Sequence, residues 1–392
     1  MTTDMIFTSE SVTSGHPDKL CDQISDAAID AFLRQDAAAH AAVECAVATG
    51  IVFLAARFVA DATIDLPVLA RQVIADAGYV DPGFDARSCS VLTSFVKLSA
   101  EMREPLLAAP DPATIDRRVA HEQANVFGYA CRETPELMPM PISLAHRLAR
   151  ALDDARRGGM TWLSPDAKTQ VSVAYRNSRP VRIHSVSLTV AVKAAAAPSE
   201  AWERLRALAF DALANCELVP DAKTEMHINA GGSYEIGGPM QHAGLTGRKN
   251  GIDTYGEIAR QSGSALSGKD PSRIDRTGAY AARHAAKNVV AAGLAERCEV
   301  HLAYAIGQAC PISFSVETFG TGRERDERIA KRLAGALDFR PLAIAHRFAL
   351  RTRPAAAGER GFYRPLAAYG HFGRSDLDLP WEATDVAEAL RE

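Results

Sequence analysis

Hydrophobic and polar positions follow one pattern three times along the chain: alternation typical of a strand, a turn, a second strand, and then helical spacing. The strand pairs are predicted at 43–58, 170–192 and 299–320, and the helices that follow them at 66–77, 199–214 and 326–337. The starts lie roughly 130 residues apart, a spacing the size of a small domain. The pattern favours three similar α+β units, each with helices on one face of a sheet. Chance recurrence of a common β-β-α unit is the alternative.

Two more helices are predicted at 18–35 and 278–293, where apolar residues line one stripe. Residues 99–118 show neither period and are predicted to form a mobile connection. Glycine and proline clusters predict loops at 231–232, 237–239, 263–268 and 354–358.

The composition is that of a globular protein. The 392 residues are 47% hydrophobic and 23% charged, and the net charge of -4 gives no general reason to bind nucleic acid or a membrane. The longest apolar stretch, 50–56, is shorter than the roughly 20 residues of a membrane span, and the N-terminus lacks the basic-then-apolar order of a signal peptide. The seven cysteines are scattered, without a C-x-x-C pair. We therefore expect reduced, mostly buried cysteines in a cytoplasmic protein.

A polar segment, Gly15-His16-Pro17-Asp18-Lys19, directly precedes the first long helix. Glycine and proline fix the turn, and they bring His16 and Asp18 close to the helix N-terminus, where backbone N–H groups favour a bound anion. An aspartate that caps the helix beside a hydrogen-bonded histidine is the structural alternative.

A second polar region combines glycines with cations in the segments GLTGRK at 244–249 and SGKDPSRIDR at 267–276. Backbone without side chains can approach a polyphosphate closely while lysine and arginine neutralise its oxygens. Asp270 and Asp275 offer oxygens for Mg²⁺. The Walker A pattern is absent. Two solvated basic loops are the alternative.

Together with SPDAKT at 164–169, these segments resemble the S-adenosylmethionine synthetase family. The resemblance covers nearly the whole chain, through FTSESVTSGHPDK at 7–19, GFDARSCSVL at 83–92, FGYACRETPELMPMPISLAHRL at 127–148, IGGPM at 236–240, AYAARHAAKNVVAAGLAERCEV at 279–300 and AAYGHFGRSDLDLPWE at 367–382. It implies three pseudo-symmetric α+β domains, each a mixed sheet with helices on one face, at about 5–100, 117–234 and 236–374. It also implies a homodimer or homotetramer with active sites at the dimer interface.

The implied activity is that of a methionine adenosyltransferase: the adenosyl group of ATP moves to a thioether sulfur, and the triphosphate is hydrolysed to pyrophosphate and phosphate. A neutral thioether needs no general base, so the difficulty is the charge that builds on the leaving triphosphate. By resemblance, the catalytic residues that line the triphosphate are His16, Lys168, Arg248, Lys249 and Lys269, further ATP contacts are Asp166, Tyr234 and Ala265, the Mg²⁺ ligands are Asp18 and Asp275, and Glu44 belongs to a K⁺ site.

Four positions of the family's methionine-binding set differ in this chain. Arg57 and His242 stand where the family has acids, Leu98 replaces a glutamine and Arg273 replaces a lysine. Cations at the acidic positions would repel an α-ammonium group. We therefore expect a thioether acid without that group, such as 4-methylthio-2-oxobutanoate, with Arg57 and Arg273 clamping its carboxylate and keto oxygens.

Other departures are smaller: the family's acidic loop is His121-Glu122-Gln123-Ala124 here, and Ser233 replaces an arginine. Two alternatives stay open. One is neutral drift in an enzyme that still uses L-methionine, and the other is a non-catalytic homologue that binds nucleotide. The retained phosphate cations and metal-binding acids argue against the second.

Overall fold

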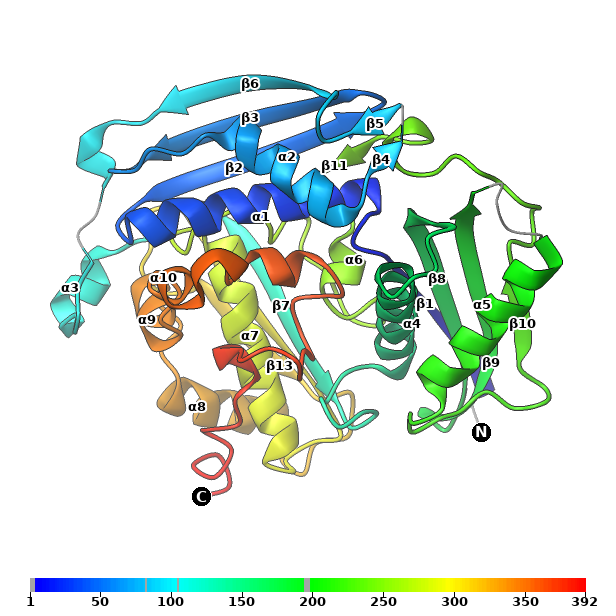
Figure 1. Ribbon diagram of the computed structural model, residues 1–392. Coiled ribbons are helices and arrows are strands. Elements are labelled where there is room, and N and C mark those ends of the chain that lie inside the picture. Colours follow the sequence, from blue (N-terminus) through cyan, green and yellow to red (C-terminus); the bar gives the residue numbers. More distant parts are fainter. Residues whose placement is uncertain (1–3, 82, 104–105, 194–197) are drawn as a thin grey trace.

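The computed structural model describes residues 4–81, 83–103, 106–193 and 198–392. The chain forms three principal sheets, each with helices packed on one side, and α1, α4 and α7 lie toward the middle of the molecule (Figure 1). This arrangement agrees with the α+β fold of three units expected from the sequence.

The first sheet is mixed, has the strand order β11-β2-β3-β6, and lies at the top of Figure 1 above its two helices. Its strands and helices are β2 (His40–Ala48), β3 (Ile51–Val59), β6 (Ser90–Lys97), β11 (Gly244–Leu245), α1 (Pro17–Gln35) and α2 (Leu66–Ala77).

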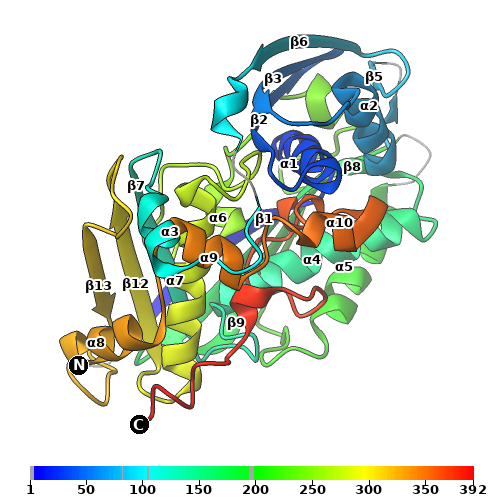
Figure 2. The same ribbon diagram turned by 90° about the vertical axis from the view of Figure 1, so that its left-hand side faces the viewer.

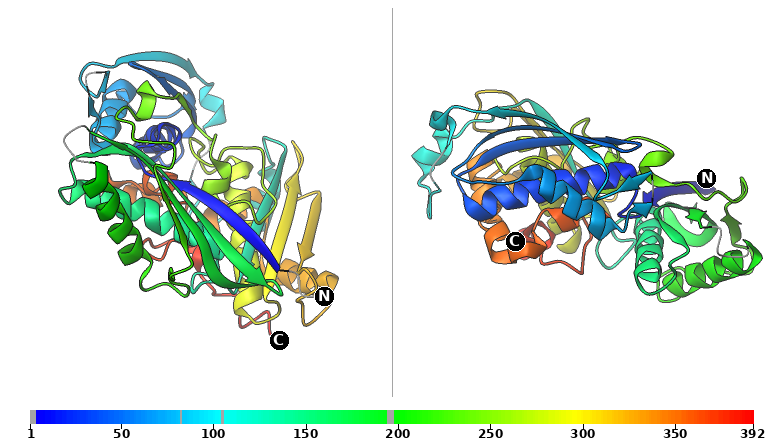
Figure 3. Two further views of the ribbon diagram at one scale, coloured as in Figure 1. Left: turned by 90° about the vertical axis from the view of Figure 1, so that its right-hand side faces the viewer. Right: turned by 45° about the horizontal axis from the view of Figure 1, so that its top comes forward.

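The second sheet is also mixed and has the order β1-β8-β9-β10. Figure 3 shows the N-terminal strand β1 running alongside strands that come much later in the sequence. The elements are β1 (Asp4–Val12), β8 (Leu163–Arg176), β9 (Arg179–Val192), β10 (Glu225–Ile228) and the helices α4 (Met140–Arg157) and α5 (Pro198–Leu213).

The third sheet is antiparallel within the described residues and has the order β13-β12-β7 (Figure 2). It comprises β7 (Ala124–Cys131), β12 (Arg297–Tyr304) and β13 (Ser313–Glu317), with α7 (Ile274–Ala291) and α8 (Asp326–Ala336) packed on it. Each principal sheet therefore joins strands from distant parts of the chain.

The remaining elements are short. They are the strand pair β4 (Val80–Asp81) and β5 (Phe84–Asp85) and the helices α3 (Pro112–Arg117), α6 (Asn250–Asp253), α9 (Pro341–Arg347) and α10 (Arg353–Ala357). Two loop predictions were wrong in part. Residues 99–118 contain α3, which Asp111 caps by accepting a hydrogen bond from the Thr114 N–H. Residues 354–358 lie largely within α10, where a proline occupies the first turn and Gly358 ends the helix.

Local signals explain where α2 begins and ends. The Asp65 side chain accepts a hydrogen bond from the Val68 N–H, and Gly78 ends the helix with a φ of 90°, which only glycine adopts readily. Between these caps, Leu66, Val73 and Ile74 face the core. The predicted bounds of 66–77 are confirmed.

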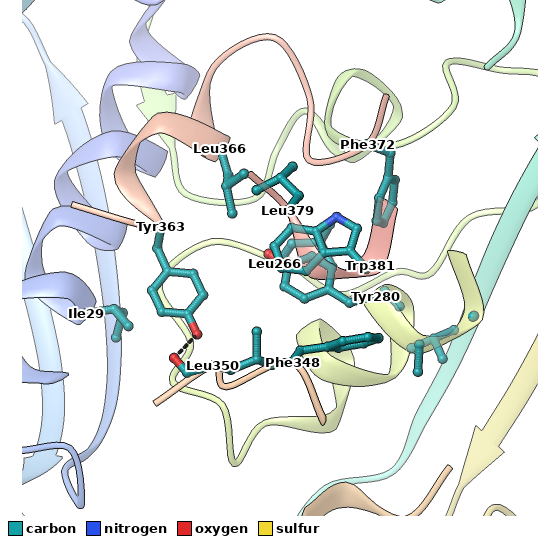
Figure 4. Packing of buried hydrophobic residues seen from close by; sticks show 14 of the residues in the cluster. Ile29, Leu266, Tyr280, Phe348, Leu350, Tyr363, Leu366, Phe372, Leu379 and Trp381 are labelled. Carbon is teal, nitrogen blue, oxygen red and sulfur yellow. Dashed lines mark hydrogen bonds between the residues drawn. The ribbon is translucent and has the colours of Figure 1, made fainter. Parts of the chain in front are cut away.

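The largest core joins the first and third sheets through α1, α7 and the C-terminal segment. Tyr280 of α7 stacks on Trp381 with ring centroids 3.7 Å apart, and the Tyr363 hydroxyl donates to the Leu350 carbonyl at 2.7 Å (Figure 4). A separate core lies between the second sheet and α4 and α5. None of the helices in the described ranges has the length and hydropathy that a membrane span requires.

Candidate active site

The loop between β1 and α1 is held tightly against β8. Gly15 lies so close to Pro165 that an added Cβ would sit 2.5 Å from its atoms, so no other residue fits without movement. Thr13 Oγ1 donates to the Pro165 carbonyl at 2.7 Å, and the Ser14 N–H donates to Asp153 at 2.8 Å. The loop therefore fixes the position of His16, which caps α1.

His16 is neutral at physiological pH. Its side chain is 2% exposed, and its Nδ1 accepts a hydrogen bond from the Asp18 N–H at 3.2 Å. Burial lowers the pKa of His16 to about 3; Asp166 opposes that shift, while Lys168 and Lys249 add to it. A neutral imidazole here can donate a hydrogen bond from Nε2 without carrying a charge.

Asp18 is buried at the start of the same helix. Its Oδ1 accepts from the Leu245 N–H at 3.0 Å and lies 3.3 Å from Arg248 Nε. Burial raises the pKa of Asp18, although the Leu245 N–H and the cations Arg248 and Lys249 oppose the shift. A positive ion close to this carboxylate would further favour its ionised form.

Asp166 of β8 faces His16 and His242. Its Oδ2 accepts from the Gly238 N–H at 2.8 Å and lies 3.1 Å from His242 Nε2. Burial would raise the pKa of Asp166, but the hydrogen bonds with His242 and the Gly238 N–H outweigh it, so the net shift is downward. Burial raises the pKa of the half-buried Tyr234, and the charge of Asp166 adds to that shift. The predicted adenine platform therefore lies near this carboxylate.

Three cations border the same space. Lys249 Nζ donates to Glu10 Oε1 at 2.8 Å, Arg248 Nη1 donates to the Ala243 carbonyl at 3.0 Å, and the exposed Lys168 pairs across the sheet with Val12. Ala265 lies directly against Gly247, whose φ of 77° and close contact both require glycine. We call the following set the His16 cluster: His16, Asp18, Asp166, Lys168, Tyr234, His242, Arg248 and Lys249.

The other predicted residues form a second group around Lys269. Lys269 pairs by a backbone bridge with Ala42 near the start of β2, and its Nζ donates to Asp275 Oδ2 at 2.6 Å. Asp275 is 3% exposed, and its Oδ1 has no hydrogen-bond partner among the described residues. A buried carboxylate oxygen without a partner is costly, which suits a metal ligand.

Arg273 contacts Glu122, an ion pair that the sequence did not predict. Burial lowers the pKa of Arg273, and the charge of Arg57 adds to the effect, so these two guanidinium groups are neighbours. The Leu98 N–H donates to the Phe58 carbonyl at 2.7 Å, directly beside Arg57. We call Arg57, Leu98, Glu122, Lys269, Arg273 and Asp275 the Lys269 cluster.

The two clusters lie at opposite ends of β2. The His16 cluster reaches the strand through Leu245, which pairs with Ala46, whereas the Lys269 cluster reaches it at Ala42. Four residues of strand separate these points, which is about 13 Å. The predicted acceptor residues are divided accordingly: His242 lies in one cluster, and Arg57, Leu98 and Arg273 lie in the other.

One face of the first sheet turns away from α1 and α2 (Figure 1). It carries Leu245, whose N–H contacts Asp18 of the His16 cluster, and the exposed Arg57 of the Lys269 cluster. Strand pairing puts Leu245, Ala46, Phe53 and Leu92 in one row across it. Five apolar side chains on this face are 42% to 52% exposed: Ile51, Phe53, Leu92, Val96 and Leu245. Glu44 is exposed on the same face. An exposed apolar patch of this kind is typical of a protein–protein interface.

Sequence reasoning missed two acidic partners. Glu10, which accepts from Lys249, and Glu122, which contacts Arg273, were not among the predicted site residues. Glu122 stands in the altered 121–124 loop, so that departure was the available signal. No local pattern singles out Glu10, because its partner is 239 residues away.

Three family models match the chain: the S-adenosylmethionine synthetase N-terminal domain over residues 4–100, the central domain over 117–234 and the C-terminal domain over 236–383.

Curated relatives align over the full length. A protein of Synechococcus sp. (strain JA-3-3Ab) called S-adenosylmethionine synthase is 47% identical, covering 99% of this chain and 97% of its own length. Proteins of the same name from Synechococcus elongatus and Microcystis aeruginosa are each 46% identical; the alignments cover 100% and 99% of this chain, and 98% and 97% of theirs.

Proposed function

Because the chain belongs to the S-adenosylmethionine synthetase family, we propose that it transfers the adenosyl group of ATP to the sulfur of a methionine-like thioether acid, with release of pyrophosphate and phosphate. The observation that carries this proposal is the His16 cluster, in which Lys168, Arg248 and Lys249 surround a neutral histidine at the N-terminus of α1. Such a site binds a polyphosphate and stabilises the charge that it gains as it leaves.

In the proposed reaction the sulfur attacks C5′ in line and no proton has to be removed. His16 donates a hydrogen bond to a phosphate oxygen, and the cations of the cluster offset the negative charge that develops on the triphosphate. Tyr234 supplies an aromatic surface for the adenine. In the second step, water would hydrolyse the bound triphosphate to pyrophosphate and phosphate, and the same cations would offset the negative charge of the phosphate oxygens.

Metal ions fit the carboxylates of both clusters. Asp18 and Asp275 are buried carboxylates, and Asp275 keeps one oxygen without a partner among the described residues. We propose that these two residues hold Mg²⁺, which when bound neutralises phosphate oxygens. Glu44 presents an exposed carboxylate on the sheet face, and we propose that it contributes to a K⁺ site.

A complete active site would need two chains. A homodimer with a two-fold axis through the exposed face of the first sheet would bring the His16 cluster of one chain opposite the Lys269 cluster of its partner. The apolar side chains on that face support this arrangement, because burying them in the dimer removes them from water. Pairing of two such dimers would give a tetramer. The seven cysteines are free thiols, which suits the reducing cytoplasm, where we propose that the enzyme acts.

For the acceptor we propose a thioether 2-oxo acid such as 4-methylthio-2-oxobutanoate. Arg57 has no side-chain ion pair or hydrogen bond among the described residues, and it neighbours Arg273, so two guanidinium groups are available for carboxylate and keto oxygens. L-Methionine is the second candidate. Glu122 favours it, since this carboxylate lies in the same cluster and could face an α-ammonium group.

The test compares the two acceptors. We expect the wild type to show a higher kcat/KM for the 2-oxo acid than for L-methionine, and the triple variant Arg57→Glu, Leu98→Gln, His242→Asp to shift the ratio toward methionine by about tenfold or more. Arg87→Glu is the matched control, because Arg87 is an exposed arginine on another segment, paired with Asp85. A wild type that strongly prefers methionine would mean that the substitutions are drift.

A further inference from the structure

Two imidazoles and one carboxylate converge where α1 begins. One potential ligand atom from each of His16, Asp166 and His242 lies within 4.8 Å of the other two. The two imidazole rings are tilted against each other with centroids 4.8 Å apart. His16 and Asp166 are buried, whereas the His242 side chain is 29% exposed, so the group is accessible from one side.

The carboxylate of Asp166 has one oxygen available to a ligand. Asp166 Oδ1 is buried and has no hydrogen-bond partner among the described residues, while Oδ2 already accepts from the Gly238 N–H. A buried carboxylate oxygen without a partner favours a cation beside it.

The donor set selects the kind of ion. Mg²⁺ and Ca²⁺ prefer oxygen ligands, whereas two imidazoles with one carboxylate suit Zn²⁺ and its neighbours in the transition series. We propose that His16, Asp166 and His242 bind a divalent transition-metal ion, with Zn²⁺ as the representative. Nδ1 of His16 accepts from the Asp18 N–H, so Nε2 is the nitrogen that would bind the ion.

The required movement is small. Metal–ligand bonds of about 2.0–2.2 Å place tetrahedral ligand atoms about 3.4 Å apart. Ligand atoms within 4.8 Å of one another therefore have to approach by up to about 1.4 Å. His242 is the most exposed of the three residues, so its side chain is the one that would move most easily. Metal binding through Nε2 would move the His16 proton to Nδ1. The ring would then exchange the hydrogen bond that it accepts from the Asp18 N–H for one that it donates to Asp18 Oδ2, which lies 3.8 Å from Nδ1.

One consequence rests on the proposed function. His16 and Asp166 are also proposed to contact ATP, so the ion and the nucleotide would compete for one place. Zn²⁺ would then occupy the nucleotide site of the ATP-free enzyme, and ATP would displace the ion.

Zn²⁺ titration of the metal-free full-length protein by calorimetry tests the site. We expect the wild type to bind one Zn²⁺ ion tightly and His242→Gln to lower that affinity by at least about tenfold. Loss of a residue that only supports a ligand typically costs about 10- to 100-fold in affinity, and His242 is proposed as a ligand itself. Glutamine can still donate to Asp166. His227→Gln is the control, because His227 forms an exposed pair with Glu225 at 3.4 Å and should leave the tight site unchanged. Equal affinity in the wild type and His242→Gln would overturn the proposal.

A second measurement does not depend on any variant's folding. Co²⁺ bound to the wild type should give the visible absorption spectrum of nitrogen and oxygen ligands. A thiolate-to-cobalt charge-transfer band would instead assign the ion to a cysteine, such as the exposed Cys310, and would contradict the proposed site. ATP binding is then measured with and without Zn²⁺. If His242→Gln loses the tight site but wild-type ATP binding ignores saturating Zn²⁺, the metal site stands and the placement of the triphosphate at His16 is wrong.

Discussion

Lys249 is a residue at which the proposed contribution to phosphate binding can be measured apart from any effect on stability. In the free chain it pairs with Glu10 at 2.8 Å, and both side chains are partly exposed. Such an ion pair contributes at most about 1 kcal/mol to stability. Lys249→Met should lower kcat by roughly 100-fold, because a charge that stabilises the leaving triphosphate is lost.

The matched control is Glu10→Gln, which breaks the same ion pair but keeps the cation. We expect its kcat to stay within about twofold of the wild type, since carboxamide for carboxylate removes only a weak surface interaction. Initial rates at saturating ATP compare kcat of the two variants, and thermal unfolding midpoints compare their stability. Equal losses of kcat would show that Lys249 acts through Glu10 and not on the substrate.

His146 should make stability depend on pH. It is buried on α4 with Nδ1 2.8 Å from Ser11 Oγ, and burial, helped by Arg374, Arg150 and Lys19, lowers its pKa to about 3. The unfolded chain takes up a proton near pH 6.5, so this contribution to stability is complete above pH 6.5 and is lost as the pH falls toward 3. Between pH 7 and 5 the loss is roughly 2 kcal/mol.

Urea unfolding at these two pH values measures that difference. His146→Gln keeps a polar side chain without the titration, so the variant should lose roughly 2 kcal/mol less than the wild type over the same interval. Its overall stability is irrelevant to the comparison, because only the change with pH is used. Parallel pH profiles for the two proteins would rule out His146 as the source.

Among the site residues, those whose neighbours are local in sequence were the easiest to predict. The order glycine, histidine, proline, aspartate before a helix predicts that His16 and Asp18 lie at the helix N-terminus, and the structure puts them there. The contacts between His16 and His242 and between Arg273 and Glu122 depend on how the sheets assemble. Periodicity carries no information about such pairs.

At the scale of elements, α1 and α7 are joined by one buried ion pair. Arg276 Nη2 donates to both oxygens of Asp26, at 2.7 and 2.6 Å, and both side chains are fully buried. Arg276 Nη1 also donates to the Lys269 carbonyl at 2.8 Å. The pair therefore connects the helix that carries the His16 cluster with the segment that carries the Lys269 cluster.

Arg276→Met should lower the free energy of unfolding by roughly 3–5 kcal/mol, because it leaves the Asp26 carboxylate buried and unpaired. The double variant Arg276→Met, Asp26→Leu should recover much of that loss, since it removes the orphaned charge as well. Denaturant unfolding of the two variants measures both effects. A double variant less stable than the single one would mean that packing around Arg276, and not the unpaired charge, controls the loss.

The same scale shows what a linear pattern predicts about a fold. The bounds of α2 follow from Asp65 and Gly78, which flank the helix, and from Pro67 in its first turn, so the sequence alone was enough. The helix α10 was missed although Pro354 lies in its first turn and Gly358 ends it, because five residues give no helical period. The strands β1 and β7 pair with strands more than a hundred residues away, and that choice is made by packing of the whole molecule.

At the scale of the whole molecule, the division of the candidate site is the main structural result. The His16 and Lys269 clusters each hold cations and a carboxylate, yet they lie at opposite ends of one exposed sheet face. In the proposed dimer, each chain would present two half-sites. A two-fold related partner would turn each half-site toward its complement, so that the dimer would have two composite sites.

Hybrid dimers test this directly. Lys249→Ala disables the His16 cluster and Lys269→Ala disables the Lys269 cluster, so neither homodimer should show more than about 1% of wild-type activity. In a hybrid, both damaged clusters fall in the same composite site and the other site is intact. Random pairing of equal amounts of the two chains makes half of the dimers hybrid, so co-expression should restore about one quarter of wild-type activity.

Separate affinity tags on the two chains allow the hybrid to be purified, and it should then reach about one half of wild-type activity. A mixture of the two purified homodimers, assayed before their subunits exchange, is the control and should stay inactive. If each chain held a complete site, every site in the hybrid would carry one defect and no activity would return. Restoration is thus the outcome that only a site shared between chains can give, whichever thioether the enzyme accepts.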